Sequence, residues 1–307
     1  MSIGLVGDVG GTNARFALAA DGVVGVSQTW KTGRVPALPH VYTTLAGALP
    51  GAPGRPDYAC IAVAAPVDGP SVTLTNADLT LDVRTLGIPR ARLANDLEAA
   101  AAGVPDVPAH LQHPLVPGPG HPQRPMVVVG MGTGLGVAIR LASGDLISGE
   151  GGHAQFAPST PQLAQLVDAL GASLERPVEW EDLLCGRGFG RILAWCRHNR
   201  ALAVSSDFSA LEATARGAVM AQDTEAYDLI VGAVADLLRG LALTVCAGSV
   251  VLCGGVAGHL REAFMRPIFA ARFRAPGPVS HVLNGVGVTL LTDDALALRG
   301  CVRLNRG

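Results

Sequence analysis

The sequence Gly-Asp-Val-Gly-Gly-Thr-Asn-Ala-Arg, residues 7–15, places the strongest constraint on the fold. It joins two short apolar runs, Ile3–Val6 and Phe16–Ala20. Apolar runs linked through Gly-Gly predict a β-hairpin whose tight turn needs backbone angles that only glycine adopts without cost. Such a turn exposes backbone N–H groups, which suit an anion such as phosphate. The alternative is an ordinary edge hairpin that binds no ligand.

Polar side chains beside this turn favour the anion-binding interpretation. Thr12 and Asn13 follow the glycines directly, and Asp8 precedes them. A carboxylate next to a phosphate is repelled unless a cation lies between the two. The stretch therefore predicts a phosphate site in which Asp8 attracts magnesium.

The same pattern occurs a second time. The apolar run Met126–Val129 leads into Gly-Met-Gly-Thr-Gly-Leu-Gly, residues 130–136, and the apolar run Val137–Leu141 follows. Neither copy has the lysine of a Walker P-loop, and neither has the spacing of a dinucleotide-binding fingerprint. We therefore expect two similar lobes that each offer a glycine hairpin to the same phosphates.

Length and composition fit an α/β protein of two lobes, because 307 residues can form two moderate domains. The segment Val104–Pro125 is rich in Pro, Gly and His, so we expect a loop there. The predicted domains are a smaller lobe over residues 1–115 and a larger lobe over residues 116–307. A carboxyl-terminal helix is expected to pack back on the first lobe.

The charge balance argues against several kinds of partner. A net charge of −2 with 16% charged residues leaves no basic surface for nucleic acid. The apolar segment Leu229–Ala247 contains Asp236 and Arg239, so it predicts a buried helix and not a membrane span. The amino terminus lacks the pattern of a signal peptide, and the six scattered cysteines predict free thiols, mostly buried. We expect a cytoplasmic protein with no membrane partner.

Apolar patterning and turn residues also predict the remaining elements. Extended segments are expected at Tyr58–Ala65, Val72–Asn76, Val250–Leu252 and Val279–Leu283. Helices are expected at His40–Leu49, Leu97–Ala102, Gln162–Leu170, Trp180–Leu184, Phe189–His198, Ser209–Ala221, Thr224–Ala247, Ala257–Ala271 and Val288–Leu298.

Asn95 and Asp96 lie where a short strand meets the helix Leu97–Ala102. Asn and Asp are good amino-terminal caps, so helix capping alone would explain both residues. The carboxyl end of a strand is also where open α/β sheets place their ligands. The position thus fits either a cap or a ligand-binding pair.

Six short motifs, taken in order, strongly resemble those of the bacterial glucokinase family, which are ATP-dependent enzymes of the actin/hexokinase/Hsp70-like superfamily. The resemblance covers nearly the whole chain and implies a two-lobed ribonuclease H-like α/β fold, with lobes that close over the sugar. The motifs are Asp8–Asn13, Leu74–Asn76, Asn95-Asp96, Gly130–Gly136, Gly149–His153 and Cys253–Gly255.

The resemblance implies a role for each residue on the sugar side. Asp96 matches the catalytic base, which accepts the proton of the sugar 6-hydroxyl group, and Asn95 would hold a neighbouring hydroxyl group. Sugar hydroxyl groups would also be bound by Glu150 and His153. The family glutamate that precedes Leu-Ser-Gly-x-Gly matches Glu181, with Glu179 as a competing choice. The remaining candidate near the sugar is Asn76.

On the nucleotide side, the resemblance implies that both hairpins hold the phosphates of ATP and that Asp8 holds Mg2+ through water. The implied residues of the hairpins are Gly10, Gly11, Thr12, Asn13, Gly132, Thr133 and Gly134. Gly254 and Gly255 would let the adenosine lie against bare backbone. The expected reaction is phosphorylation of glucose by ATP to glucose 6-phosphate, and we also expect a homodimer.

Some positions depart from the family pattern. Leu97 replaces the usual Phe after Asn-Asp, and Asn284–Thr289 replaces the usual Pro-Gly-Leu-Leu-Gly. The first cysteine after His153 is Cys185, so we expect no zinc site of the kind that related ROK proteins carry. The role of Arg15, at a phosphate or at the surface, stays open.

Three other functions compete with glucokinase. One is a kinase of mannose, fructose or an amino sugar in the same superfamily. Another is a sugar-responsive repressor, which would need a DNA-binding helix-turn-helix where only two residues precede Ile3. The third is a nucleotide-binding interaction protein without turnover, which sugar-dependent ADP production would exclude.

Overall fold

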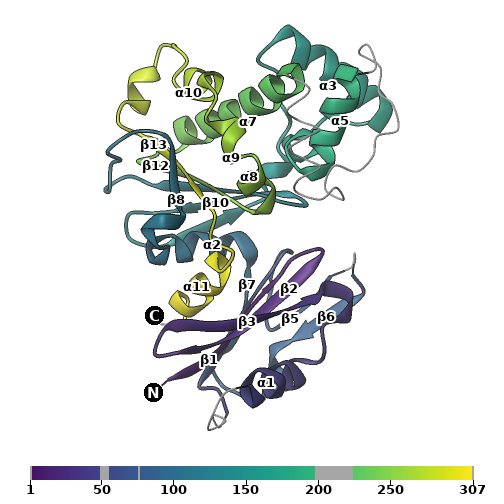
Figure 1. Ribbon diagram of the computed structural model, residues 1–307, viewed down its shortest axis with the longest axis vertical. Helices are drawn as coiled ribbons and strands as arrows, with labels where there is room; N and C mark the ends of the chain where they lie inside the picture. Colours follow the sequence, from purple (N-terminus) through teal and green to yellow (C-terminus); the bar gives the residue numbers. More distant parts are fainter. Residues whose placement is uncertain (1, 49–54, 75–76, 198–223, 306–307) are drawn as a thin grey trace. The chain divides into compact units, whose positions relative to one another are not determined.

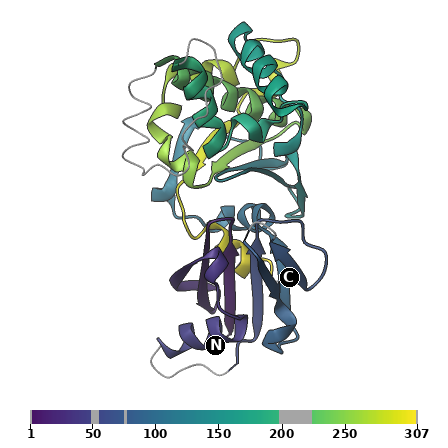
Figure 2. The same cartoon turned by 90° about the vertical axis from the view of Figure 1, so that its right-hand side faces the viewer.

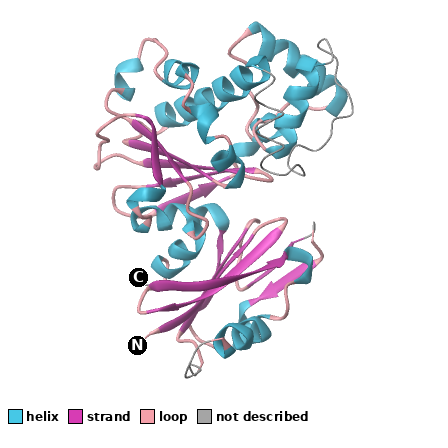
Figure 3. Cartoon of the chain, in the orientation of Figure 1, coloured by secondary structure: helices cyan, strands magenta, loops and turns pink. Residues whose placement is uncertain are grey.

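The computed structural model describes residues 2–48, 55–74, 77–197 and 224–305. The chain divides into two compact units. The first contains Met1–Pro108, Leu146–Ser148 and Asp293–Gly307, and the second contains Ala109–Asp145 and Gly149–Thr292. Each unit combines a mixed β-sheet with helices (Figure 1 and Figure 3). Asn76 and the helix expected at Ser209–Ala221 lie outside the described residues.

The first unit has a five-stranded sheet in the order β3-β2-β1-β4-β7. The first three strands form an antiparallel meander, whereas β1, β4 and β7 run parallel. The strands are β1 (Ile3–Val9), β2 (Asn13–Ala20), β3 (Val23–Lys31), β4 (Tyr58–Val63) and β7 (Ala91–Asn95). A separate hairpin consists of β5 (Ser71–Leu74) and β6 (Leu79–Asp82).

Both faces of this sheet are covered, because neighbouring residues on a strand point to opposite faces. Leu5 packs in a cluster with residues of α1 (Leu38–Gly47), whereas Val6 packs in a cluster with residues of α11 (Leu296–Arg303). Helix α11 also packs against α2 (Asp96–Gly103). Figure 2 shows the yellow carboxyl-terminal helix beside the purple strands of the first unit.

The second unit repeats the arrangement of antiparallel hairpin and parallel strands. Its sheet has the order β11-β10-β9-β12-β13-β8, in which β9 pairs with β10 antiparallel and with β12 parallel. Three residues of the edge strand β11, Leu146–Ser148, are those assigned to the first unit above. The strands are β8 (Gln112–Val116), β9 (Met126–Met131), β10 (Leu135–Arg140), β11 (Leu146–Gly149), β12 (Ser249–Cys253) and β13 (Gly287–Leu291). The second glycine hairpin is therefore confirmed.

The long helix α7 organises the core of the second unit and packs against β9, β12 and α10. The buried side chains form one large hydrophobic cluster. The helices are α3 (Pro161–Leu174), α4 (Trp180–Leu183), α5 (Gly186–Arg197), α7 (Thr224–Thr244), α8 (Gly255–His259), α9 (Arg261–Phe264) and α10 (Pro267–Phe273). In the described part of the chain, no helix is long and apolar enough to span a bilayer.

The structure corrects the element assignments towards the carboxyl terminus. The helix predicted at Val288–Leu298 is wrong, because β13 occupies its first half and α11 begins only at Leu296. Asp293 accepts a hydrogen bond from the Ala295 N–H group. This bond stabilises the turn between β13 and the start of α11. The segment Ser280–Leu283, expected to be extended, forms the 3-10 helix η7.

Two further assignments were also wrong. The expected loop Val104–Pro125 contains strand β8 and the 3-10 helices η3 (Val104–Asp106) and η4 (Ala109–Leu111). Strand β8 forms because it pairs with the edge of β13, a contact that its own composition does not signal. The single helix expected at Ala257–Ala271 is divided into α8, α9 and α10.

Candidate active site

The first glycine turn presents backbone donors. The Gly10 N–H group donates to the Asn13 carbonyl oxygen at 3.0 Å and closes the turn. Within the described residues, the N–H groups of Gly11 and Thr12 have no acceptor. A Cβ atom placed on Gly11 would meet no heavy atom within 4 Å. The turn therefore has open N–H groups of the kind that bind anions.

The prediction that this turn needs backbone angles that only glycine adopts without cost is wrong. Neither Gly10 nor Gly11 has a positive φ angle. The turn spans enough residues to close with ordinary backbone angles, so left-handed conformations are not needed. What glycine contributes here is the lack of a side chain over the exposed backbone.

Asp8 lies on β1, opposite Arg15 of β2. Burial raises the pKa of the Asp8 carboxyl group to about 6, although the nearby Arg15 lowers it. Arg15 is itself bound to Asp294, by a hydrogen bond to the backbone oxygen and an ion pair of 3.6 Å with the carboxylate. A half-buried carboxylate whose nearest cation is shared in this way fits the binding of an added cation such as Mg2+.

A lysine that the sequence reasoning missed lies beside the same turn. Lys31, at the end of β3, donates from Nζ to Asn13 Oδ1 at 3.0 Å. The next residue, Thr32, donates from its hydroxyl group to the Gly10 carbonyl oxygen at 2.7 Å. The chain has one lysine among 23 basic residues, and a count of residue types would have singled it out. Its nearness to the turn depends on strand register and is not visible in the sequence.

Asn95 and Asp96 follow β7 and begin helix α2. Asn95 is the amino-terminal cap, because its Oδ1 atom accepts hydrogen bonds from the N–H groups of Leu97 and Glu98 at 2.9 and 3.2 Å. Asp96 is the first helical residue and is half-buried. Asp96 Oδ1 also accepts a hydrogen bond from the Leu97 N–H group at 2.9 Å, so Asp96 contributes to the start of helix α2 as well.

The second glycine turn, Gly132–Gly134, also presents backbone donors. The Gly132 N–H group donates to the Gly134 oxygen at 2.9 Å, whereas those of Thr133 and Gly134 have no acceptor in the described part of the chain. Glu181 supports this turn, since its Oε2 atom accepts a hydrogen bond from the Leu135 N–H group at 2.8 Å. A Cβ atom on Gly134 would lie 2.7 Å from that oxygen, so glycine permits the contact.

Gly254 and Gly255 follow β12, at the same edge of the sheet as the second turn. Gly254 has a φ angle of +99°, and a Cβ atom there would lie 2.4 Å from the Met131 carbonyl oxygen. Only glycine suits this position. Gly255 has open space around its Cα atom, which agrees with a role as bare backbone against a planar ligand.

The candidates for sugar binding in this unit lie at η5 (Gly151–His153) and α4. Glu150 precedes η5 and is exposed, and His153 ends η5. His153 Nδ1 lies 2.8 Å from Glu179 Oε2. The hydrogen bond with Glu179 raises the pKa of His153, and burial opposes that change. The structure thus brings Glu179, and not Glu181, into contact with His153.

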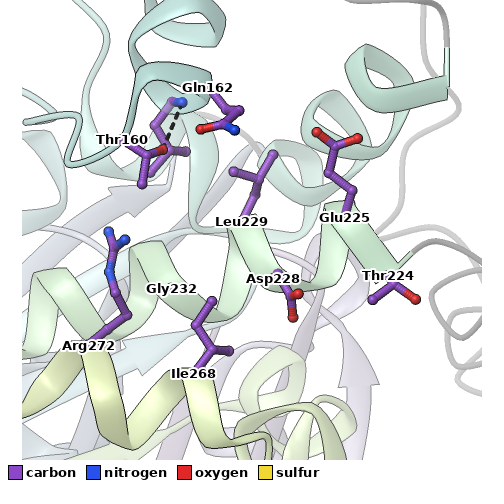
Figure 4. Close-up of a pocket in the computed structure, with 10 residues that line it drawn as sticks. Thr160, Gln162, Thr224, Glu225, Asp228, Leu229, Gly232, Ile268 and Arg272 are labelled. Atoms are coloured by element: carbon purple, nitrogen blue, oxygen red, sulfur yellow. Dashed lines mark hydrogen bonds between the residues drawn. The ribbon is translucent and has the colours of Figure 1, made fainter.

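A cavity of about 460 Å³ lies elsewhere in the second unit, among α3, α7 and α10 (Figure 4). Its charged lining residues already have partners, since Asp228 binds Arg266 at 2.7 Å and Arg272 binds Asp236. None of the predicted site residues lines this cavity. We therefore do not place the active site there.

The cysteines and His113 are further side chains of the types that react or bind metals. None of the six cysteines, all of which lie among the described residues, forms a disulfide bond, and four of them are buried, as expected. His113 Nε2 lies 3.0 Å from Thr292 Oγ1. Among the described residues, no group of three or more His, Cys, Asp or Glu side chains is arranged to hold a metal ion.

Comparison with known proteins decides the family. The family model described as Glucokinase matches residues 5–306. The chain belongs to the glucokinase family. It is 34% identical to the glucokinase of Marinobacter nauticus, over 96% of this chain and 95% of that protein. It is 32% identical to the glucokinase of Chromobacterium violaceum, over 96% and 87% of the respective chains.

A crystal structure of glucokinase from an Antarctic psychrotroph is similar to this chain, with a TM-score of 0.83 and 25% identity, over 100% of this chain and 99% of the other. These matches confirm the predicted glucokinase family and the actin/hexokinase-type α/β fold.

Proposed function

We propose that this chain transfers the terminal phosphoryl group of ATP to the 6-hydroxyl group of glucose. The observation that carries the proposal is the match of the glucokinase family model to residues 5–306. The two open glycine turns and the polar pair at the end of β7 supply the kinds of groups that this reaction requires.

In the proposed mechanism, Asp96 is the general base. Phosphoryl transfer needs an oriented nucleophile and neutralised charge, and a nearby carboxylate accepts the hydroxyl proton as the new O–P bond forms. Asn95 uses its oxygen as the helix cap and donates weakly to the Ala65 oxygen at 3.4 Å. Its second N–H bond is therefore the group available to a sugar hydroxyl.

On the nucleotide side, the N–H groups of both turns would bind phosphate oxygens. Asp8 would hold Mg2+ through water, and the metal would supply neutralisation of the phosphate charge. The residue that supports magnesium binding is Asp8. Burial raises the pKa of its carboxyl group, so a nearby cation would stabilise the charged form. Gly254 and Gly255 would contact the adenosine.

On the sugar side, Glu150, His153, Glu181 and Asn76 are the proposed ligands. A carboxylate accepts hydrogen bonds and an imidazole can donate or accept, which suits a ring of adjacent hydroxyl groups. Glu181 would combine this role with its support of the Leu135 N–H group. We further propose that the protein acts in the cytoplasm. We also propose that it is a homodimer, and light scattering of the purified protein tests this oligomeric state.

A coupled assay with ATP, magnesium and glucose tests the proposal directly. We expect glucose-dependent ADP formation with a 1:1 yield of glucose 6-phosphate. A panel with mannose, fructose and glucosamine tests the alternative acceptors, and a higher kcat/KM for any of them would replace glucose as the substrate. ADP formation with none of the four sugars would overturn the proposal.

A further inference from the structure

The contact between His153 and Glu179 is built by two backbone segments that run side by side. Gln155 and Glu179 form an isolated antiparallel β-bridge. The Trp180 N–H group donates to the Ala154 oxygen at 3.1 Å, and the Phe156 N–H group donates to the Val178 oxygen at 2.8 Å. These bonds hold His153 and Glu179 in register, so their contact does not depend on two free surface side chains.

Packing below the contact fixes the same register. The rings of Phe156 and Trp180 lie 4.3 Å apart between centroids, and Phe156 is buried in the core of the second unit. Gly152, the residue before His153, packs so closely on β10 that a Cβ atom would lie 1.9 Å from the Leu135 oxygen. The turn that carries His153 is therefore tightly seated on the sheet.

Glu179 is itself held in place. It caps helix α4 in a capping box with Asp182, whose Oδ2 atom accepts from the Glu179 N–H group at 3.0 Å. Its Oε1 atom lies 3.6 Å from Arg176 Nη1, while Oε2 faces His153. The Glu179 side chain keeps 28% of its surface exposed, against 52% for His153. Glu179 is the better anchored partner of the two.

The contact with Glu179 gives the two ring nitrogens of His153 different hydrogen-bonding roles. A carboxylate only accepts hydrogen bonds, so Nδ1 must carry a proton. Within the described residues, Nε2 has no hydrogen-bond partner. It is therefore the nitrogen that remains for a ligand. Besides Glu179, the charged groups that act on the ring are Glu150 and Glu181, and Arg176 pairs with Glu179.

Resting on the proposed function, we propose that Glu179 is a positioning residue for glucose binding. It fixes the tautomer and the orientation of His153 through Nδ1, so that Nε2 meets a sugar hydroxyl group, and Glu179 itself touches no substrate. Glu181, two residues along, serves a different partner, the Leu135 N–H group at the second glycine turn. The two glutamates thus have separate roles and do not compete for one.

Two substitutions separate the hydrogen bond from the charge. Glu179→Ala removes both, and we expect the KM for glucose to rise roughly tenfold while kcat changes less than about threefold. Glu179→Gln keeps an acceptor for Nδ1–H and for the cap of α4 but removes the charge, so its KM should rise less. The KM for ATP should stay unchanged in both variants.

A second measurement does not depend on activity. The pKa of His153, followed by proton NMR and assigned by comparison with His153→Asn, should fall in both Glu179 variants. Arg176→Gln is the matched control, because it removes the other ion-pair partner of Glu179 and leaves the contact with His153. The control should keep the wild-type KM for glucose even if its thermal midpoint falls.

Two outcomes would overturn the proposal. One is an unchanged pKa of His153 in Glu179→Ala and Glu179→Gln. The other is a glucose KM that rises equally in Glu179→Gln and Arg176→Gln, because that result reports only a loosened helix α4. If the wild-type chain phosphorylates no sugar, the proposed function fails by itself, and the NMR titration still shows whether Glu179 controls His153.

Discussion

Burial of Asp8 makes the stability of the protein depend on pH. The pKa of the Asp8 carboxyl group is about 6 in the folded state, against 3.8 for an aspartate carboxyl group exposed to water. The folded state therefore binds the proton more tightly, and this contribution to stability is lost as the pH rises from about 4 to about 6. The loss amounts to about 3 kcal/mol at most, because residual solvent contact reduces it.

We expect Asp8→Asn to melt at a higher temperature than the wild type at pH 7.5 and at about the same temperature at pH 4, without nucleotide or magnesium. The amide carries no charge to bury, so the pH-dependent loss disappears. Differential scanning calorimetry at both pH values provides the measurement. Asp168→Asn, at an exposed aspartate, is the control. A difference that does not grow with pH would contradict the assigned pKa.

Replacement of Asp96 tests the chemical step. Asp96→Asn should lower kcat by roughly two to four orders of magnitude, with little change in glucose affinity, because a general base acts in the transition state. Glu98→Gln is a matched control in the same helical turn, where Glu98 binds Arg92 at 3.1 Å. Steady-state kinetics and glucose titration measure both effects. Near-normal turnover in Asp96→Asn would remove Asp96 from the mechanism.

The hairpin formed by β2 and β3 brings Lys31 to the first glycine turn, which predicts a contribution to nucleotide binding. We expect Lys31→Met to raise the KM for ATP roughly three- to tenfold and to leave the KM for glucose unchanged. Since Lys31 is the single lysine of the chain, amine acetylation followed by mass spectrometry gives a second test. ATP with magnesium should slow acetylation of Lys31, and an unchanged rate would argue against the contact.

Elements with a strong local signal were predictable from the sequence, and those made by distant contacts were not. The hairpin β1-β2 and strand β4 follow from apolar runs and glycines close together in the chain. Strand β8 contains His113 and Pro114 and depends on its pairing with β13. Strand β13 was predicted as part of a helix over Val288–Leu298, although Thr292-Asp293-Asp294 interrupts the apolar run. The pairing of β13 with β12 and the hydrogen bond from the Ala295 N–H group to Asp293 separate the strand from α11.

The candidate site was also predictable only where the sequence carries a local signal. The glycine turns were predicted from residue types, whereas the roles of Asp96 and His153 came from the resemblance to a family. The contacts that refine those roles, Lys31 with Asn13 and Glu179 with His153, join residues 18 and 26 positions apart. Such contacts depend on strand register and helix placement, which a single sequence does not determine.

The two units share one plan, in which an antiparallel hairpin with a glycine turn adjoins parallel strands. The two glycine turns, the Asn95-Asp96 pair and Gly254-Gly255 lie where strands β1, β7, β9 and β12 end, whereas Glu150, His153 and Glu181 lie at η5 and α4. Parallel strands collect their carboxyl ends at one edge of a sheet, and that edge carries ligand sites in open α/β sheets. The repeated plan explains why short motifs far apart in the chain all follow strands.

Binding of a substrate stabilises the whole protein by mass action, so glucose should raise the thermal midpoint. At a concentration of about 100 times Kd the gain is about 2.7 kcal/mol. We expect Asp96→Asn to keep this rise, because the base contributes to the transition state, whereas Glu150→Gln should need roughly tenfold more glucose for the same rise and show a higher glucose KM. Thermal melts over a glucose series measure both. If Glu150→Gln instead raised only the KM for ATP, Glu150 would belong to the nucleotide side of the reaction.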